Sequence, residues 1–304
     1  MLVDELGRRL VGLRDTDRPA VVGCSGGPDS VALLVLAVHA SLQPVAVHVD
    51  QGLRDGSDTE SAVVADLAAR FGVPFVAEAA PVVPGPNLEA RAREARYAAL
   101  ERARRARDAP VVLVAHTADD QAETVLLNLL RGGASAGLGG MGERRDALVR
   151  PLLGIRRFET EALCAEQGLV PLRDPSNDDT RLRRNWIRHD VLPLLNTGAA
   201  RDLVPILSRQ AALFRSESEF LDELARASWA PDGTASSVEL QRLPPVLARR
   251  AVRQWLGPPP PSLADVERVL AVAGGECRAT EVAGGRRVWR SRGRLYAERG
   301  TVTA

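Results

Sequence analysis

The segment VVGCSGGPDSVALLVLA, residues 21–37, places a glycine-rich turn between two apolar runs. The first run is short and β-branched, and the second has the spacing of a buried helix. A strand that enters a helix through such a turn leaves backbone N–H groups at the helix N-terminus free to bind an anion. The sequence therefore predicts an anion-binding loop that consists of Ser25, Gly26, Gly27, Pro28, Asp29 and Ser30.

This loop carries polar groups that a plain glycine turn does not need. Ser25 and Ser30 add hydroxyl donors, and Asp29 can hold Mg²⁺ or orient a neighbouring group. The chain contains no lysine, so all 40 basic residues are arginine. That absence excludes an NTPase of the Walker type, a Schiff-base enzyme and any catalytic lysine. Phosphate binding by a different kind of loop is therefore favoured over a purely structural turn.

Length and composition limit the class of protein. A chain of 304 residues with 45% apolar content can bury a large core, and its length predicts two domains. Cys24, Cys164 and Cys277 are far apart, which argues against a disulfide framework, a zinc site and a cysteine-bound iron–sulfur cluster. The absence of an apolar signal segment and of a membrane-spanning run predicts a cytoplasmic protein without a membrane partner.

Strand and helix patterns alternate in the first half of the chain. Strands are expected at 44–50, 73–79 and 110–116, and helices at 59–71, 87–107 and 118–131. Near-continuous apolar strands separated by helices indicate an α/β fold with a parallel sheet covered on both faces. Ligands of such sheets bind at the carboxyl ends of the strands, which is where Ser25, His48 and His116 fall.

The second half has a different pattern. The segment 132–143 is too glycine-rich to order itself, so we expect a mobile loop over the sheet edge. Helical patterns resume near residue 158 and from 201 to 229, and a Gly284-Gly285 pair predicts a hairpin between short C-terminal strands. We therefore expect a catalytic α/β domain at 1–195 and a smaller, mainly helical domain with a basic C-terminal β-hairpin at 196–304.

The segment AHTADDQAETVLL begins at a strand end and enters a helix. His116, Asp120 and Glu123 would share one face if the first turn is helical. Thr117 with Asp120 also fits a capping box, and Asp119 fits a first-turn acid that complements the helix dipole. Two neighbouring carboxylates beside an anion site nevertheless need a cation, either Mg²⁺ or a substrate ammonium.

The glycine loop resembles the SGGxDS signature of the PP-loop ATP pyrophosphatases, which cleave ATP between the α and β phosphates. The motifs HVDQGLR, NLEARAREARY, HTADDQAETVLLNLLRG, GLGGM, RPLL and DPSNDDTRLRRNWIR resemble those of the tRNA(Ile)-lysidine synthetase family, in the same order. The likeness covers most of residues 18–195, and it implies a Rossmann-like PP-loop domain followed by a tRNA-binding domain.

Members of that family adenylate the C2 carbonyl oxygen of the wobble cytidine, position 34, in a CAU anticodon. The ε-amine of free lysine then displaces AMP and leaves lysidine. The resemblance therefore implies ATP and Mg²⁺ as cofactors, and CAU-anticodon tRNA(Ile) and free L-lysine as partners. The sequence leaves a homodimer open.

The resemblance also implies roles at the nucleotide. The loop 25–30 would bind the triphosphate, with Mg²⁺ on Asp29, and His48 and Val49 would border adenine and ribose. His48 fits a satisfied structural histidine equally well. Gln51 stands where the family commonly has histidine, so no proton transfer is assigned to it.

On the same resemblance, Asp120 and Glu123 would hold lysine, Mg²⁺ or both, and a carboxylate could accept the proton that the ε-ammonium must lose. Arg93 and Arg96 would bind the α phosphate or the tRNA backbone, and His116 would orient the site or simply cap and pack. The implied catalytic residues are Asp29, Arg93, His116, Asp120 and Glu123. Further family positions, expected at the anticodon loop or the lysine pocket, are Arg150, Asn177, Arg184, Asn185 and Arg188.

Three other classes of function stay open at this point. A PP-loop tRNA thiolase activates a base carbonyl for sulfur, although the absence of CxxC pairs counts against its cluster-bearing forms. An ammonia-dependent ligase such as an NAD synthetase would release pyrophosphate only with ammonium. A non-enzymatic RNA-binding or nucleotide-sensing protein would bind ATP without turnover, which the intact loop and acids argue against.

Overall fold

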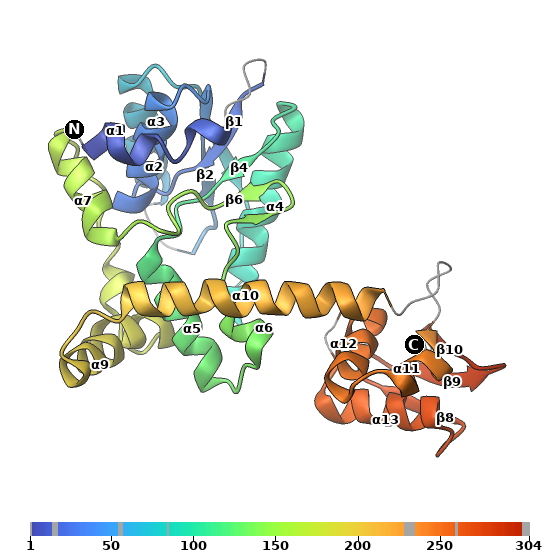
Figure 1. Cartoon of the computed structure of the whole chain (residues 1–304). Coiled ribbons are helices and arrows are strands. Elements are labelled where there is room, and N and C mark those ends of the chain that lie inside the picture. The colour runs from blue at the N-terminus through green and yellow to red at the C-terminus, as the bar shows by residue number, and fades with distance from the viewer. Residues whose placement is uncertain are drawn as a thin grey trace. The chain divides into compact units, whose positions relative to one another are not determined.

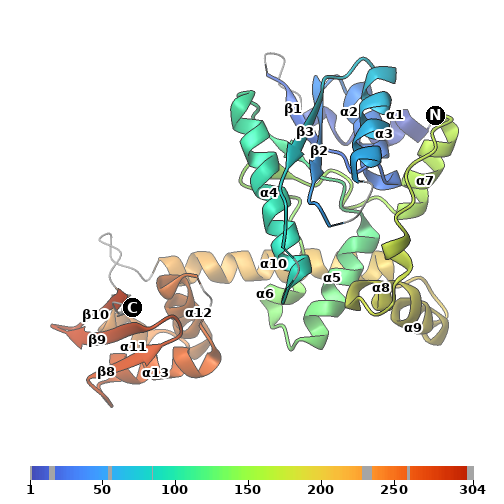
Figure 2. The same ribbon diagram turned by 180° about the vertical axis from the view of Figure 1, so that it is seen from behind.

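The protein is described here from a computed structural model that covers residues 2–13, 18–53, 57–83, 85–227, 235–258 and 261–299. Contacts divide the chain into two compact units, Met1–Leu213 and Phe214–Ala304. The division falls inside the long helix α10 (Val204–Arg226), and each unit has its own buried core. Figures 1 and 2 show the elements of both units from opposite sides.

The first unit has α/β architecture. Its strands are β1 (Ala20–Gly23), β2 (Pro44–Asp50), β3 (Phe75–Ala79), β4 (Val112–Leu113), β5 (Arg144–Arg145) and β6 (Leu148–Val149). Its helices are α1 (Leu2–Gly7), η1 (Val11–Leu13), α2 (Pro28–His39), α3 (Ser57–Arg70), α4 (Leu88–Ala106), α5 (Ala118–Leu130), α6 (Ser135–Leu138), α7 (Arg157–Glu166), η2 (Pro175–Asp178), α8 (Arg183–Trp186), η3 (Ile187–Val191), α9 (Leu192–Ala199) and the start of α10. The strand predicted at 44–50 coincides with β2, and the helix predicted at 118–131 ends one residue beyond α5.

The strands form one sheet in the order β3-β2-β1-β4-β6-β5. Every neighbouring pair is parallel except β5 with β6, which is antiparallel. The predicted parallel sheet is therefore confirmed, and its antiparallel edge was not foreseen. Strand β4 is shorter than the predicted 110–116, but the chain continues beside β6, where the Val114 N–H donates to the Val149 carbonyl at 3.0 Å.

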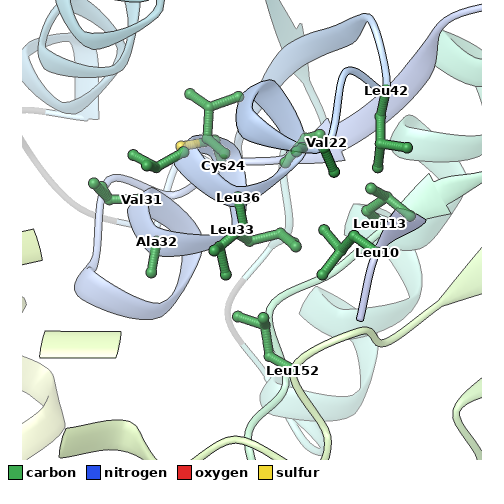
Figure 3. Packing of buried hydrophobic residues seen from close by; sticks show 14 of the residues in the cluster. Leu10, Val22, Cys24, Val31, Ala32, Leu33, Leu36, Leu42, Leu113 and Leu152 are labelled. Atoms are coloured by element: carbon green, nitrogen blue, oxygen red, sulfur yellow. The ribbon is translucent and has the colours of Figure 1, made fainter. Parts of the chain in front are cut away.

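Helices cover both faces of this sheet, as the apolar strands predict. On one face Val22 of β1 is buried in a cluster with Leu33 and Leu36 of α2 (Figure 3). On the other face Val21 is buried with Leu100 of α4. Burying a side chain of this size contributes about 1.5–3 kcal/mol, so alternate residues of one strand fasten helices to opposite faces.

The segment 132–143 is ordered by side chains of α5. It contains the helical turn α6, and Gln121 Nε2 donates to the Met141 carbonyl at 2.9 Å while Gln121 Oε1 accepts from the Met141 N–H at 2.8 Å. Asn128 Nδ2 donates to the Gly137 carbonyl at 2.7 Å. The segment is therefore held by hydrogen bonds that α5 supplies and that glycines lack, while the mobility expected from its sequence stays a prediction.

The substitution Gln121→Ala should loosen this segment selectively. It removes both bonds to Met141, whose backbone groups then lose their partners in a buried position, at a cost of about 2 kcal/mol. Hydrogen exchange followed by mass spectrometry should show faster exchange at 132–143 and little change in β1 and β2. Asn128→Ala, which removes one bond, should have a smaller effect. Unchanged exchange in Gln121→Ala would contradict this account.

The second unit contains the end of α10 and a small α+β arrangement. Its other elements are β7 (Ala235–Ser236), α11 (Ser237–Arg242), α12 (Pro245–Leu256), α13 (Leu263–Gly274), β8 (Ala279–Val282), β9 (Arg286–Ser291) and β10 (Arg294–Arg299). The strands form an antiparallel sheet in the order β7-β10-β9-β8. Its buried cluster includes Val252 of α12, Val269 of α13 and Leu295 of β10.

The predicted hairpin is confirmed within a larger sheet. Gly284 and Gly285 have φ values of 81° and 64°, which suit the tight turn between β8 and β9. The helix predicted at 201–229 begins at Val204, and its predicted end lies outside the described residues. In the parts of the chain that the structure describes, no helix is both long enough and apolar enough to cross a membrane.

Candidate functional site

The glycine loop joins β1 to α2 at the carboxyl edge of the sheet. Gly26 has φ +84°, and a Cβ there would lie 2.5 Å from Leu172 Cδ1, so conformation and space both require glycine. Gly27 caps α2 without a side-chain hydrogen bond, and Pro28 has no N–H. The N–H groups of the first turn are therefore not occupied by a capping side chain and can receive an anion.

The two serines of the loop have different positions. Ser30 is buried, and its Oγ accepts from the Ser25 N–H at 3.2 Å and donates to the Gly27 carbonyl at 2.9 Å. Ser25 is exposed, with its Oγ 3.3 Å from Ser30 Oγ. Ser30 thus shapes the loop from inside, and Ser25 presents its hydroxyl to the outside.

His48 and Val49 lie at the end of β2, next to this loop. His48 is only 3% exposed, and its Nδ1 lies 3.1 Å from the Cys24 carbonyl, to which it donates. This contact is the one expected of a structural histidine that braces β2 against the loop. Val49 is half-buried, and Gln51 is tied to α4 because its Nε2 donates to the Ala92 carbonyl at 2.5 Å.

The three predicted acids, Asp29, Asp120 and Glu123, converge on one place. Asp120 completes the capping box of α5, since its Oδ2 accepts from the N–H of Thr117 at 2.8 Å while its Oδ1 contacts arginines. Glu123, one turn further along, is 1% exposed. His116 precedes α5 and its N-cap Thr117, so it lies outside the helical turn that sharing a face with these acids would require.

Arginines of the chain itself neutralise these acids. Arg184 Nε and Arg188 Nε each lie 2.7 Å from an oxygen of Glu123, and Arg184 Nη2 lies 3.1 Å from Asp120 Oδ1. They are one helical turn apart, where α8 passes into the π-helical η3, a kind of helical irregularity that is frequent at functional sites. Among the described residues, the cation that the paired carboxylates require is thus supplied by arginine.

Sequence reasoning missed two residues of this site, Arg157 and Thr160 of α7. Arg157 Nη2 lies 2.9 Å from Asp120 Oδ1, and Thr160 Oγ1 donates to Asp29 Oδ1 at 2.5 Å. The segment IRRFET, residues 155–160, contained a signal for these residues. Arginines at the start of a helix interact unfavourably with its dipole, so they indicate acidic partners elsewhere in the fold. The carboxylates that act as these partners lie far away in the sequence.

Burial and arginine contacts set the protonation of the acids. Burial raises the pKa of Asp29 to about 6, although Arg157 and the hydroxyl of Thr160 oppose the rise. Burial would also raise the pKa of Asp120, but Arg184 and Arg157 outweigh it and hold that pKa below its ordinary value. Asp120 therefore stays ionised, which suits it to bind a cation and makes it a weak proton acceptor.

A second group of cations surrounds His116. Arg93 Nη1 lies 3.5 Å from His116 Nε2, and the Arg93 guanidinium lies 5.0 Å from the Tyr97 ring centroid, with Arg96 at 5.9 Å from the same ring. Burial lowers the pKa of His116 to about 3. Burial also lowers the pKa of Arg93, as do nearby Arg184, Arg96 and Arg150. The imidazole is therefore neutral at pH 7 and can accept from Arg93.

Several buried polar atoms near these cations have no hydrogen-bond partner among the described residues: His116 Nδ1, Tyr97 Oη and Arg150 Nε. Arg150 is otherwise anchored, because its Nη1 donates to the Gly142 carbonyl at 2.7 Å. Buried donors without partners are rare in folded proteins. A group of arginines that lies beside hydrogen-bond donors without partners suits an anionic ligand with several oxygens, such as a phosphate group.

The other two predicted residues, Asn177 and Asn185, shape the preceding turn. Asn185 is buried, and its Nδ2 donates to the Ser176 carbonyl at 2.7 Å and to the Asp179 carbonyl at 3.0 Å. Asn177 is exposed, and its carbonyl accepts from His189 Nε2 at 2.9 Å. Asn185 thus holds the turn that leads into the helix of Arg184 and Arg188.

One carboxylate of the site fits a Mg²⁺ ion that is bound together with a nucleotide. Within the described ranges, no group of three His, Cys, Asp or Glu side chains is arranged to hold a metal ion. Mg²⁺ bound with a nucleotide usually takes one or two protein carboxylates together with phosphate oxygens and water. Asp29, at the start of α2 beside the loop, fits as such a single carboxylate ligand.

Family models match both parts of the chain. A PP-loop domain model matches residues 4–195, and a TilS substrate binding domain model matches residues 237–296. The tRNA(Ile)-lysidine synthase of Rhodococcus erythropolis is 42% identical over 243 residues, which cover 79% of this chain and 74% of that protein. The tRNA(Ile)-lysidine synthase of Thermus thermophilus is 42% identical over 270 residues, which cover 84% of this chain and 52% of that protein.

A solved structure supports the fold. The U34-tRNA thiolase NcsA from Methanococcus maripaludis, with its [4Fe-4S] cluster, is similar with a TM-score of 0.55 over 71% of this chain and 79% of its own. At 18% identity this likeness concerns the fold alone. The PP-loop model covers more than half of the chain, and together with the 42% identity to the Rhodococcus protein it shows that this chain belongs to the tRNA(Ile)-lysidine synthase family.

Proposed function

We propose that this protein forms lysidine at the wobble cytidine of a CAU-anticodon tRNA(Ile), using ATP and free L-lysine. The observation that carries the proposal is the convergence of Asp29, at the anion-binding loop, with Asp120 and Glu123 in a chain of the lysidine synthase family. A tRNA substrate fits the cytoplasmic location that the sequence predicts.

In the first step the C2 oxygen of the cytidine attacks the α phosphorus of ATP, and the bond to pyrophosphate breaks. The N–H groups at the start of α2 and the hydroxyl of Ser25 bind the departing phosphates. Arg93 and Arg96 face the charge that develops at the α phosphate. Asp29 would hold Mg²⁺, which when bound neutralises the charge of the triphosphate.

In the second step the ε-amine of lysine attacks C2, and the bond between C2 and the AMP oxygen breaks. Asp120 and Glu123 attract the ammonium groups of lysine, and Arg184 and Arg188 attract its carboxylate. The acids and arginines pair with one another at up to 3.1 Å, so lysine would exchange with these contacts, its ammonium groups replacing arginine at the acids and its carboxylate replacing the acids at the arginines. The ε-ammonium must lose a proton before it attacks. Since Asp120 is held ionised by arginines, it serves to bind lysine, and the proton passes to water.

We propose further that residues 1–195 carry the chemistry and residues 196–304 hold the tRNA. On one face of the C-terminal sheet, Trp289 stacks on Tyr296 at 5.7 Å between ring centroids. Exposed Arg287 and Arg294 lie on the same face by strand alternation. Half-exposed aromatics between arginines suit an RNA backbone and its bases, and such contacts weaken as salt rises.

Incorporation of radiolabelled lysine tests the proposed function. With MgATP and a CAU-anticodon tRNA(Ile) transcript, we expect label that survives the alkali treatment that strips aminoacyl esters. A transcript with U in place of the wobble C should take up no label, because its base lacks the exocyclic amine and ring pattern of cytosine. Pyrophosphate release that depends on tRNA but leaves no label would contradict lysine as the nucleophile and favour ammonia or sulfur.

A further inference from the structure

Arg157 has no task in the two steps above, yet it contacts all three acids of the site. Its Nε lies 3.3 Å from Asp29 Oδ2, its Nη2 lies 2.9 Å from Asp120 Oδ1, and its Nη1 lies 3.5 Å from Glu123 Oε1. Asp29 belongs to α2, whereas the other two acids belong to α5. A single guanidinium therefore bridges the nucleotide side and the lysine side of the proposed site.

The backbone of Arg157 is itself fixed against α5. Its N–H donates to Asp119 Oδ2 at 2.7 Å, and the guanidinium of Arg156 pairs with the same carboxylate at 3.1 Å. Two arginines at the start of α7 disfavour the helix locally, since the positive end of the dipole lies there. The acids of α5 and α2 compensate for this, so the position of Arg157 is set by the tertiary structure.

The same helix holds the second oxygen of Asp29. Thr160 Oγ1 donates to Asp29 Oδ1 at 2.5 Å, while Arg157 takes Oδ2. Arg157 and Thr160 are three residues apart and therefore lie on one face of α7. A single turn of this helix thus hydrogen-bonds to both oxygens of the Asp29 carboxylate. Arg184 and Arg188 contact Asp120 and Glu123, and among the described contacts neither reaches Asp29.

We propose that Arg157 is a positioning residue, which fixes the Asp29 carboxylate at a set place relative to Asp120 and Glu123. This inference rests on the proposed function only for its first step, in which Asp29 meets the nucleotide. A planar guanidinium can contact carboxylates from separate directions at once, whereas an ammonium is a single point of charge. Arg157→Lys should therefore keep the charge and lose the bridge.

Pyrophosphate release with the tRNA transcript tests the inference. For Arg157→Lys and Arg157→Ala we expect kcat to fall about 100-fold, as for a small misplacement of a reacting group, with the KM for tRNA unchanged. Millimolar guanidinium chloride should raise the rate of Arg157→Ala at least about 10-fold over equal sodium chloride, since the free cation can enter the vacated position. A role in stability alone would give no such rescue.

Arg70→Gln is the matched control, because Arg70 holds the other end of α7 by donating to the carbonyls of Gln167 and Gly168. We expect near-normal release from this variant and no response to guanidinium. Wild-type kcat in Arg157→Lys, equal losses in Arg70→Gln, or no guanidinium rescue would each overturn the inference. Intact pyrophosphate release without lysine incorporation in the unmodified protein would count against the proposed function and leave the role of Arg157 standing.

Discussion

Asp29→Ala should lower tRNA-dependent pyrophosphate release by at least about 1,000-fold, the scale on which removal of a key charge-stabilising group acts. The reason is position, because Asp29 lies in the first turn of α2, next to the N–H groups that we propose bind the phosphates. The same variant should bind the tRNA transcript nearly as well as the unmodified protein in a filter-binding assay. We propose that the tRNA phosphates are bound elsewhere in the chain, so tRNA binding should not depend on this carboxylate.

Asp29→Asn separates charge from shape. It keeps the size of the side chain and an oxygen for the Thr160 hydroxyl, which lies 2.5 Å from Asp29 Oδ1. If Asp29 acts through its negative charge, as a Mg²⁺ ligand would, Asp29→Asn and Asp29→Ala should lose activity equally. Full activity of Asp29→Ala would remove this residue from the mechanism.

Glu123→Gln should impair lysine use more than it impairs formation of the adenylated tRNA. It should also destabilise the fold by roughly 3 kcal/mol, because a carboxylate that is 1% exposed is replaced while Arg184, Arg188 and Arg157 remain around it. In a unit of this size that corresponds to a fall in Tm of about 6–12 °C. Differential scanning fluorimetry measures the fall, and single-turnover assays with and without lysine separate the two steps.

Glu101→Gln is the matched control for stability. Glu101 also accepts hydrogen bonds from arginines, Arg104 and Arg105 at 2.7 Å, but at a half-exposed position of α4. A pair that water reaches in this way contributes about 1 kcal/mol or less, so we expect a smaller change in Tm than for Glu123→Gln. Equal loss of adenylation and lysine transfer in Glu123→Gln would contradict a lysine role and point to a metal ligand.

Local patterns predicted most of the first unit. The β-branched run at 44–50 and the capped apolar pattern from Ala118 are strong short-range signals, and β2 and α5 follow them closely. The loop of the site could also be predicted from local sequence, since the positive φ of Gly26 and its close packing require glycine there. The ordering of 132–143 was missed because the stabilising partner, Gln121, lies in another element.

The sequence by itself determined the β-loop-α unit, the parallel sheet and the acids Asp29, Asp120 and Glu123, because each is written in contiguous residues with a recognisable period or motif. Only the tertiary structure decided what neutralises those acids. Arg157, Arg184 and Arg188 reach them from helices that lie 34 to 128 positions away along the chain. Electrostatic pairing depends on distance in space, so the packing of α7 and α8 against α2 and α5 had to be known before these contacts could be identified.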